Sequence, residues 1–319
     1  MSAPIVSGGG KRATREAFGA TLVELAQEGR DDIVALDADL SSSTTTGRFA
    51  AVYPERFFNV GIAEQNMIGT AAGLALAGKT AFTGSFAVFA TGRAYDQIRN
   101  TVCYSGLDVK LSPTHSGITV GPDGGSHQML EDIALMRVLP GMRVLVPADF
   151  NAARAAMRIA AETPGPFYVR LGRATLPAIY DEDATFELGK AYVLREGGDV
   201  TLAACGVMVE RALAAARILE QEGIWAEVVD VFSVKPLDEE TILASAGKTG
   251  AVVTCEEHEI AGGMGSAVAE LLSERLPTHM TRVGVRDRFG TSGDPEELMA
   301  HFGLTASDIA DAARVLTNG

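Results

Sequence analysis

The feature that most constrains the fold is an alternation of short apolar runs with stretches of helical periodicity. Runs of strand type stand at 33–36, 57–60, 80–83, 109–111, 143–146 and 167–171. Helical patterns appear at 14–27, 62–77, 87–105, 129–136 and 150–162, the last with Asp149 as N-cap. Strands that alternate with helices form mainly parallel sheets covered by helices. The sequence therefore predicts an α/β domain over residues 1–180.

The alternation restarts after an acidic stretch at 180–186. Strands are expected at 200–204, 226–231, 252–255 and 280–285, and helices at 209–222, 238–246 and 266–275. This predicts a second domain over 181–319, so the fold class is α/β with two domains, each a mainly parallel sheet flanked by helices. The glycines at 262–265 do not match a dinucleotide-binding fingerprint, because their spacing is wrong and the preceding strand ends several residues earlier. We expect this domain to have a dimerising or stabilising role.

Composition excludes several classes of protein. The net charge of −14 argues against nucleic-acid or anionic-membrane binding. The three cysteines are isolated from one another, so no disulfide framework or cysteine metal site is predicted. No apolar run approaches the roughly 18 residues of a membrane span, and residues 1–10 lack the regions of a signal peptide. We therefore expect a cytoplasmic protein without a membrane or nucleic-acid partner.

Glu64 stands where a predicted strand becomes a helix with small side chains. Five of the 13 phenylalanines lie between Phe57 and Phe89, so this carboxylate has aromatic neighbours. It then needs a charged partner or must be neutral, unless it is an ordinary acid that complements the helix dipole. Gly69 and Gly73 each cost the helix about 1 kcal/mol relative to alanine, which predicts close approach of another backbone to that face.

Two further segments follow predicted strands and are rich in polar residues. Asp39–Thr46 is rich in serine and threonine, and a glycine-rich loop carries His115 and His127. Ligands of parallel sheets bind at the carboxyl ends of strands, so both loops are candidate site walls. The first is equally well explained as an ordinary solvated loop. The 12-residue separation of the histidines does not fit a zinc motif, so no metal site is predicted here.

Three motifs connect these segments to a known family. FNVGIAEQNMIG, GSFAVFATGRAYDQIRN and THSGITVGPDGGSHQMLEDIALMR occur in this order. They resemble the pyrimidine-binding half of the thiamine-diphosphate enzymes of the transketolase group. The likeness continues through the C-terminal third, so the chain resembles the second half of a full transketolase.

The resemblance implies a cofactor site. Glu64 would contact the aminopyrimidine ring of thiamine diphosphate and help to activate the cofactor. Phe86 and Phe89 would pack on that ring, and Gly92 replaces a third aromatic residue of the family. The cofactor-binding candidates are Asp39, Glu64, Phe86, Phe89 and Arg93.

The resemblance also implies a sugar-phosphate site. His115 and His127 would line the sugar channel and join Glu64 as catalytic candidates. Arginines without a carboxylate nearby suit a phosphate group. The substrate-binding candidates are Arg15, Ser43, His115, Asp123, His127 and Arg173.

Half of such an active site is missing from the sequence. The family binds the cofactor's diphosphate through a metal ion and a GDG motif, and no GDG occurs here. We therefore expect an N-terminal transketolase subunit as the partner, which carries this motif and holds Mg²⁺ or Ca²⁺. Closed two-fold assembly would then give a dimer of heterodimers.

The leading interpretation is the C-terminal subunit of a split transketolase that moves a two-carbon ketol unit from a ketose phosphate to an aldose phosphate. The alternatives are a subunit like deoxyxylulose-phosphate synthase, a 2-oxo acid dehydrogenase E1 β subunit and a non-catalytic scaffold. The GPDGGSHQ loop argues against E1, and Glu64 with both loop histidines argues against a scaffold. RAYDQ at 93–97 and Gly92 favour the synthase, whereas His115 stands where synthases carry an arginine.

Overall fold

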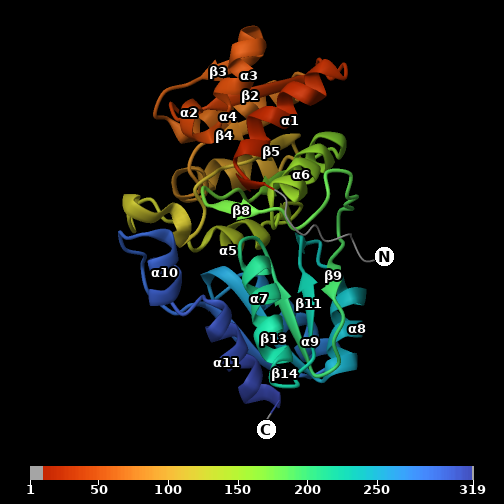
Figure 1. The fold of residues 1–319 in the computed structure, drawn as a ribbon. Coiled ribbons are helices and arrows are strands. Elements are labelled where there is room, and N and C mark those ends of the chain that lie inside the picture. The colour runs from red at the N-terminus through yellow and green to blue at the C-terminus, as the bar shows by residue number, and fades with distance from the viewer. Residues whose placement is uncertain (1–9, 318–319) are drawn as a thin grey trace.

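The computed structural model describes residues 10–317, which form two stacked α/β halves (Figure 1). The N-terminal half contains a seven-stranded sheet of order β12-β6-β7-β5-β4-β2-β3, in which every neighbouring pair is parallel except β12–β6. Its strands are β2 (Ile33–Asp37), β3 (Phe57–Asn59), β4 (Thr80–Gly84), β5 (Val109–Leu111), β6 (Arg143–Leu145), β7 (Phe167–Val169) and β12 (Ser233–Lys235). The predicted strands of this half are therefore confirmed.

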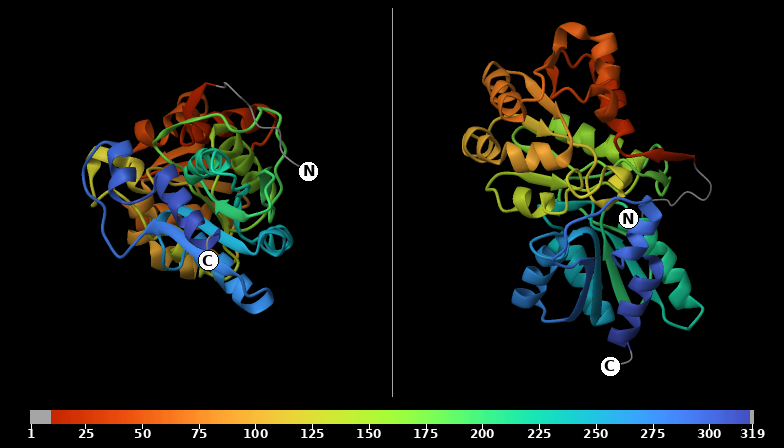
Figure 2. Two further views of the ribbon diagram at one scale, coloured as in Figure 1. Left: turned by 60° about the horizontal axis from the view of Figure 1, so that its bottom comes forward. Right: turned by 90° about the vertical axis from the view of Figure 1, so that its left-hand side faces the viewer.

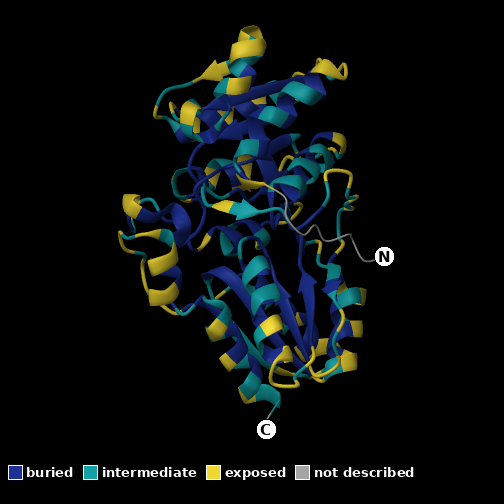
Figure 3. Ribbon diagram, in the orientation of Figure 1, coloured by how far each residue is buried: buried dark blue, intermediate teal, exposed yellow. Residues whose placement is uncertain are grey.

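Alternation of side chains along the strands gives this sheet two apolar faces. On one face Ile33 and Ala35 pack with α1 (Glu16–Gln27) and α6 (Phe150–Glu162). On the other, Val34 and Leu36 pack with α4 (Glu64–Leu76) and α5 (Asp132–Arg137). A strand exposes successive residues to opposite faces, so a strand of continuous apolar residues is buried on both sides. Figure 3 shows the buried strands at the centre of each half.

Several segments differ from the expectation. The helix predicted at 87–105 consists of two π-helical segments, Val88–Arg93 and Gln97–Cys103. The Thr91 hydroxyl donates to the Ala87 carbonyl at 2.7 Å, and such a bond competes with the regular backbone ladder. The loop at 39–46 contains the short helix α2 (Ser41–Thr44) and leads into α3 (Gly47–Val52). The helix predicted from residue 129 begins only at Asp132, because Met129 pairs with Gly117 in an isolated β-bridge.

The C-terminal half contains a five-stranded sheet of order β14-β13-β10-β11-β9. Its strands are β9 (Tyr192–Arg195), β10 (Val200–Ala204), β11 (Ala226–Asp230), β13 (Ala251–Glu259) and β14 (His279–Val285), and only β9 is antiparallel. Helices α7 (Met208–Glu220) and α11 (Ala306–Thr317) cover one face, and α8 (Glu239–Thr249) and α9 (Met264–Arg275) the other. β13 extends to Glu259, so the prediction that this strand ends at residue 255, several residues before the glycine turn, was wrong.

Five elements near the ends of the two halves were not predicted. β1 (Lys11–Ala13) pairs antiparallel with β8 (Thr175–Pro177), which ties the start of the described chain to the end of the first half. The other three, β9, α10 (Pro295–His301) and α11, lie in the C-terminal half. None of the described helices is long and apolar enough to cross a membrane.

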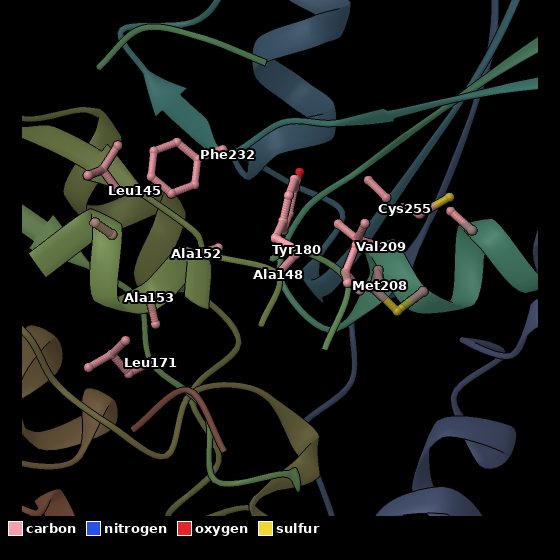
Figure 4. Close-up of a cluster of buried hydrophobic side chains, with 14 of the residues drawn as sticks. Leu145, Ala148, Ala152, Ala153, Leu171, Tyr180, Met208, Val209, Phe232 and Cys255 are labelled. Carbon is pink, nitrogen blue, oxygen red and sulfur yellow. The ribbon is translucent and has the colours of Figure 1, made fainter. Parts of the chain in front are cut away.

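The two halves share more than a linker. β12 follows β11 of the C-terminal sheet, yet it pairs antiparallel with β6 of the N-terminal sheet. The Lys235 ammonium donates to the main-chain oxygens of Arg137 and Leu139 at 2.7 and 2.6 Å. Figure 4 shows side chains from both halves in one apolar cluster, and Figure 2 shows the halves in contact from two other directions. A division at residue 180 stays a prediction, because the chain returns to the first sheet after that point.

Candidate functional site

The candidate residues lie at one edge of the N-terminal sheet. Asp39 follows β2, Glu64 follows β3, Phe86 follows β4, His115 follows β5 and Arg173 follows β7. These five strands run parallel, so their carboxyl ends meet at the same edge. The fold therefore gathers segments that are up to 158 residues apart, as the hydrogen bond from the Thr14 hydroxyl to the Gly172 carbonyl illustrates.

Glu64 is the first residue of α4 and is only 2% exposed. Gly61 precedes it with a φ of +73°, a conformation that glycine adopts without strain, and Asn59 accepts from the Gly61 amide at 3.0 Å. Both carboxylate oxygens of Glu64 accept from Nη1 of Arg93, at 3.1 and 3.0 Å. Of the two states expected for a carboxylate in this setting, the structure contains the ion-paired one.

An aromatic wall continues from this ion pair. The Arg93 guanidinium lies 4.4 Å from the centre of the Phe89 ring, and Phe89 stacks on Phe86 with ring centres 6.0 Å apart. His127 meets both rings edge-on, at 6.2 and 5.4 Å. Among residues 10–317, nothing lies within 4 Å of a Cβ built at Gly92, so the position where the resemblance implies a third aromatic residue is open. The wall thus has two rings and a histidine edge.

His115 completes the wall and joins it to the arginines. Its ring stacks on Phe86 at 3.8 Å between centres, Nδ1 lies 2.7 Å from the Thr114 hydroxyl, and Nε2 lies 3.3 Å from Nη1 of Arg15. Burial, followed by the charges of Arg15 and Arg173, lowers the pKa of His115 to about 3. The ring is therefore neutral, with Nε2 as the acceptor for Arg15 and Nδ1–H as the donor to Thr114.

Two guanidinium groups stand at the end of this wall. Nη1 of Arg15 donates to the main-chain oxygen of Ser43 at 2.9 Å, so two of the substrate-binding candidates are in contact. The pKa of Arg15 is lowered, first by burial and then by the charge of Arg173. Arg173 donates to the Val120 carbonyl at 2.7 Å and to Asp123 at 3.3 Å. The expectation of a carboxylate-free setting is therefore wrong for Arg173, because the glycine-rich loop folds Asp123 back onto it.

Asp39 lies apart from these contacts. It is exposed, has a φ of +65° and exchanges hydrogen bonds with Asn59 at 3.1 and 3.2 Å. Its loop is set by Asp37, which sequence reasoning missed: this buried carboxylate accepts from the Leu40 amide at 2.6 Å and from the Thr44 and Thr46 hydroxyls at 2.7 and 2.8 Å. An acid at the end of a buried strand, followed by a serine- and threonine-rich run, was the available signal.

A second missed group comes from the C-terminal half. Glu256, Glu257 and His258 are consecutive and buried on β13; Glu257 lies near Arg170 and His258 near Asp132 of the N-terminal half. Three consecutive ionisable residues inside an apolar strand were the available signal in the sequence. Among residues 10–317, no group of three or more His, Cys, Asp or Glu side chains is arranged to hold a metal ion.

Comparison with known proteins gives the family. Residues 10–178 match the family described as "Transketolase, pyrimidine binding domain", and residues 189–309 match "Transketolase, C-terminal domain". The chain belongs to the transketolase family. Membership of this family implies thiamine-diphosphate dependence. The similarity to C-terminal subunits of split transketolases, described below, implies a separate N-terminal subunit and oligomerisation.

Three similar proteins narrow the resemblance within the transketolase family. The chain is 49% identical to a putative transketolase C-terminal section of Methanocaldococcus jannaschii over 94% of each protein. It is 49% identical to a 6-deoxy-6-sulfo-D-fructose transketolase subunit of Clostridium sp. (strain MSTE9), over 95% of this chain and 94% of that one. A solved structure described as a split gene transketolase, an inactive β4 tetramer, superimposes with a TM-score of 0.90 at 54% identity and covers 96% of this chain and 98% of that chain.

Proposed function

We propose that this chain is the C-terminal subunit of a split transketolase. With a partner that supplies the diphosphate-binding half, it transfers a two-carbon ketol unit from a ketose phosphate to an aldose phosphate. The observation that carries the proposal is an unbroken series of contacts from the buried acid Glu64 to Arg15, which runs through Arg93, Phe89, Phe86 and His115.

The acid end of this series fits the aminopyrimidine ring of thiamine diphosphate. Phe86 and Phe89 offer an apolar stacking surface, and Glu64 stands near it with its carboxylate buried. When bound, the cofactor supplies a nucleophilic carbon that attacks a ketose carbonyl. Glu64 would hold a proton at a ring nitrogen, which requires one of its oxygens to exchange Arg93 for that nitrogen. Arg93 is half exposed and can move outward.

The arginine end of the series fits a sugar phosphate. Arg15 and Arg173 are close enough for their charges to repel, and an anion between them would relieve that repulsion. His115 is neutral, so its Nε2 can accept from a sugar hydroxyl once Arg15 turns toward a phosphate. Asp123 and His127 lie on the same loop and would contact further hydroxyls. The net charge of −14 makes this local pair of arginines necessary for an anionic substrate.

The face of α4 next to Glu64 supports a partner subunit. Within the described chain, a Cβ at Gly69 or Gly73 would meet nothing within 4 Å, so the predicted close approach does not come from this chain. Leu76, at the C-terminal end of α4, is 74% exposed, and Ile62, two residues before the helix begins, is 78% exposed. We infer that a helix of another subunit covers this face and that Mg²⁺ or Ca²⁺ with the diphosphate lies on the GDG-containing partner.

Synthase chemistry is the second candidate, because Gly92 and the RAYDQ segment at 93–97 favour it. Two incubations of the reconstituted complex decide between the reactions. We expect transfer between xylulose 5-phosphate and ribose 5-phosphate, and no CO₂ from pyruvate with glyceraldehyde 3-phosphate. Release of CO₂ in the second incubation, together with no transfer in the first, would overturn the transketolase proposal.

A further inference from the structure

We propose that Glu257, from the C-terminal half, is a positioning residue that holds the sugar-binding loop in its working shape. The inference rests on the proposed function for its kinetic consequence only. Its structural content concerns the loop from His115 to Gln128, which the sequence assigned to the N-terminal half alone. The C-terminal sheet would thus take part in substrate binding without contacting the substrate.

Glu257 reaches directly into this loop. Its Oε1 accepts from the Thr119 amide at 2.6 Å, and its side chain is 4% exposed. The carboxylate also packs on Gly117, where a Cβ would overlap it and where φ is +79°. The loop therefore passes over the Glu257 carboxylate between His115 and Asp123, and a buried amide depends on this one acceptor.

The Glu257 carboxylate is itself fixed from the N-terminal half. Nη1 of Arg170 lies 3.9 Å from Oε2 of Glu257, and Nη2 of Arg170 donates to the main-chain oxygen of Glu257 at 3.0 Å. Arg170 is held in turn by two bonds to Asp132, at 2.7 and 3.1 Å. Arg170 thus holds the Glu257 side chain from the N-terminal half, which positions its oxygen to accept from the loop.

A second contact from the C-terminal half fixes the other end of the loop. Nε2 of Gln128 donates to the Thr291 carbonyl at 2.9 Å. A Cβ at Gly124 would overlap Ser292, and one at Gly125 would overlap the Gly290 carbonyl. Gly124 and Gly125 are thus required by the close approach of residues 290–292, which lead toward α10 beside the loop in Figure 1. Glu257 therefore holds the middle of the loop, and the contact of Gln128 with Thr291 holds its end.

Glu257→Asp is the discriminating variant, because it keeps the charge beside Arg170 and withdraws the acceptor from Thr119. Glu256→Asp is the matched control. Glu256 is the neighbouring buried acid on β13, but its oxygens accept from the Met264 and Gly265 amides at 2.7 and 2.9 Å, at the start of α9. Glu257→Gln keeps both length and an acceptor oxygen, so it serves as the conservative rescue.

The first readout is hydrogen exchange of the full chain without a partner, which does not depend on any reaction. In Glu257→Asp we expect about tenfold faster exchange of amides 117–121, with Glu256→Asp and Glu257→Gln within threefold of wild type there. Equal loop exchange in the two Asp variants would overturn the proposal. So would rapid exchange of the Thr119 amide in the wild-type chain, a result that needs no variant to fold.

The second readout is steady-state kinetics of the reconstituted complex with xylulose 5-phosphate and ribose 5-phosphate. Glu257→Asp should raise KM about tenfold, change kcat less than threefold and leave thiamine-diphosphate affinity within twofold of wild type. A fall in kcat at unchanged KM would overturn the positioning role. If wild type transfers no ketol unit but the exchange result holds, the proposed function fails and the loop contact stands.

Discussion

His115 adopts a left-handed backbone conformation with a φ of +60°, which is costly for a residue with a side chain. The stack on Phe86 and the contacts with Thr114 and Arg15 hold it there. Strain that surrounding contacts enforce is typical of functional positions. Burial and the neighbouring arginine charges also lower the pKa of the ring. At this residue the fold therefore imposes an uncommon backbone conformation and disfavours the protonated imidazole.

The lowered pKa of His115 makes a prediction about stability against pH. The unfolded chain protonates His115 near 6.5, whereas the folded chain does so near 3. The unfolded state therefore binds the extra proton between these values, and the stabilisation present above pH 6.5 is lost as pH falls. At pH 5 the loss is about 2 kcal/mol.

Chemical denaturation of wild type and His115→Gln at pH 7.5 and 5 measures how much stability His115 costs the folded chain on acidification. The variant should lose less stability on acidification than wild type. The difference between the two proteins is needed because Glu256, whose pKa burial raises to about 7, contributes with the opposite sign over part of this range. An identical loss in both proteins would mean that His115 is protonated in the folded chain.

Glu64→Gln should abolish activation of the cofactor with little change in the fold. Glutamine keeps the size of the side chain but cannot pass a proton to a ring nitrogen, and one general acid–base group contributes about 10²–10⁴ in rate. Deuterium exchange at the thiazolium carbon in the reconstituted complex measures this step. Glu24→Gln is the control, since Glu24 also pairs with arginines but lies on α1. If deuterium exchange in Glu64→Gln is as fast as in wild type, Glu64 serves only as an acid that complements the dipole of α4.

Arg173→Ala should raise KM for phosphorylated sugars about 10- to 100-fold more than for unphosphorylated ones, since a charge-assisted contact contributes about 1.5–3 kcal/mol. Unphosphorylated donors with the same variant are the internal control, because they report the loss of the contact to Asp123 alone. Parallel losses for both classes of sugar would exclude a phosphate role for Arg173.

At the scale of single elements, α4 differs from the other long helices in its exposed glycine stripe. Gly73→Leu should raise the free energy of unfolding of the isolated chain, because glycine costs a helix about 1 kcal/mol relative to better helix formers and the site is open. The same change should prevent association with the partner subunit. Gly247→Ala in α8 is the control: it should also stabilise, yet leave association unchanged. Sedimentation of the mixed subunits measures the outcome, and full assembly of Gly73→Leu would place the partner elsewhere.

Elements were predictable from sequence where local pattern determines them. β2, β4, β10 and β11 coincide with strands predicted from the sequence, and Asp149 caps α6 as expected, accepting from the Ala152 amide at 2.8 Å. The π-helical turns at 88–103 were not predictable, because their apolar spacing resembles that of an α-helix. β12 was missed because three residues carry no period and their strand partner comes from another part of the chain.

The site was predictable as a set of residues, since motifs specify which side chains follow which strand, although the assigned roles remain predictions. The contacts between these side chains were not predictable from the sequence. Glu64 with Arg93 depends on how the π-helical segment turns toward α4. Glu257 with Thr119 joins positions 138 residues apart and depends on how two sheets dock. Contacts of this kind are set by tertiary packing and leave no local signal in the sequence.

At the scale of the whole molecule, the chain is expected to be inactive alone. Purified without its partner, it should bind thiamine diphosphate weakly and show no ketol transfer; mixing with a GDG-containing subunit should restore both. The similar split transketolase structure described as an inactive β4 tetramer is consistent with this expectation. Calorimetric titration of thiamine diphosphate and a coupled transfer assay, before and after mixing, provide the measurement. Turnover by the isolated polypeptide would exclude a split active site.

The pairing of β12 with β6 limits how this chain can be recombined. A cut between the family domains, near residue 185, would remove the antiparallel neighbour of β6 and uncover a sheet edge, which is a template for unwanted pairing. The two halves of this chain cannot be shuffled independently, since a chimera must inherit β6, β12 and Lys235 from the same parent.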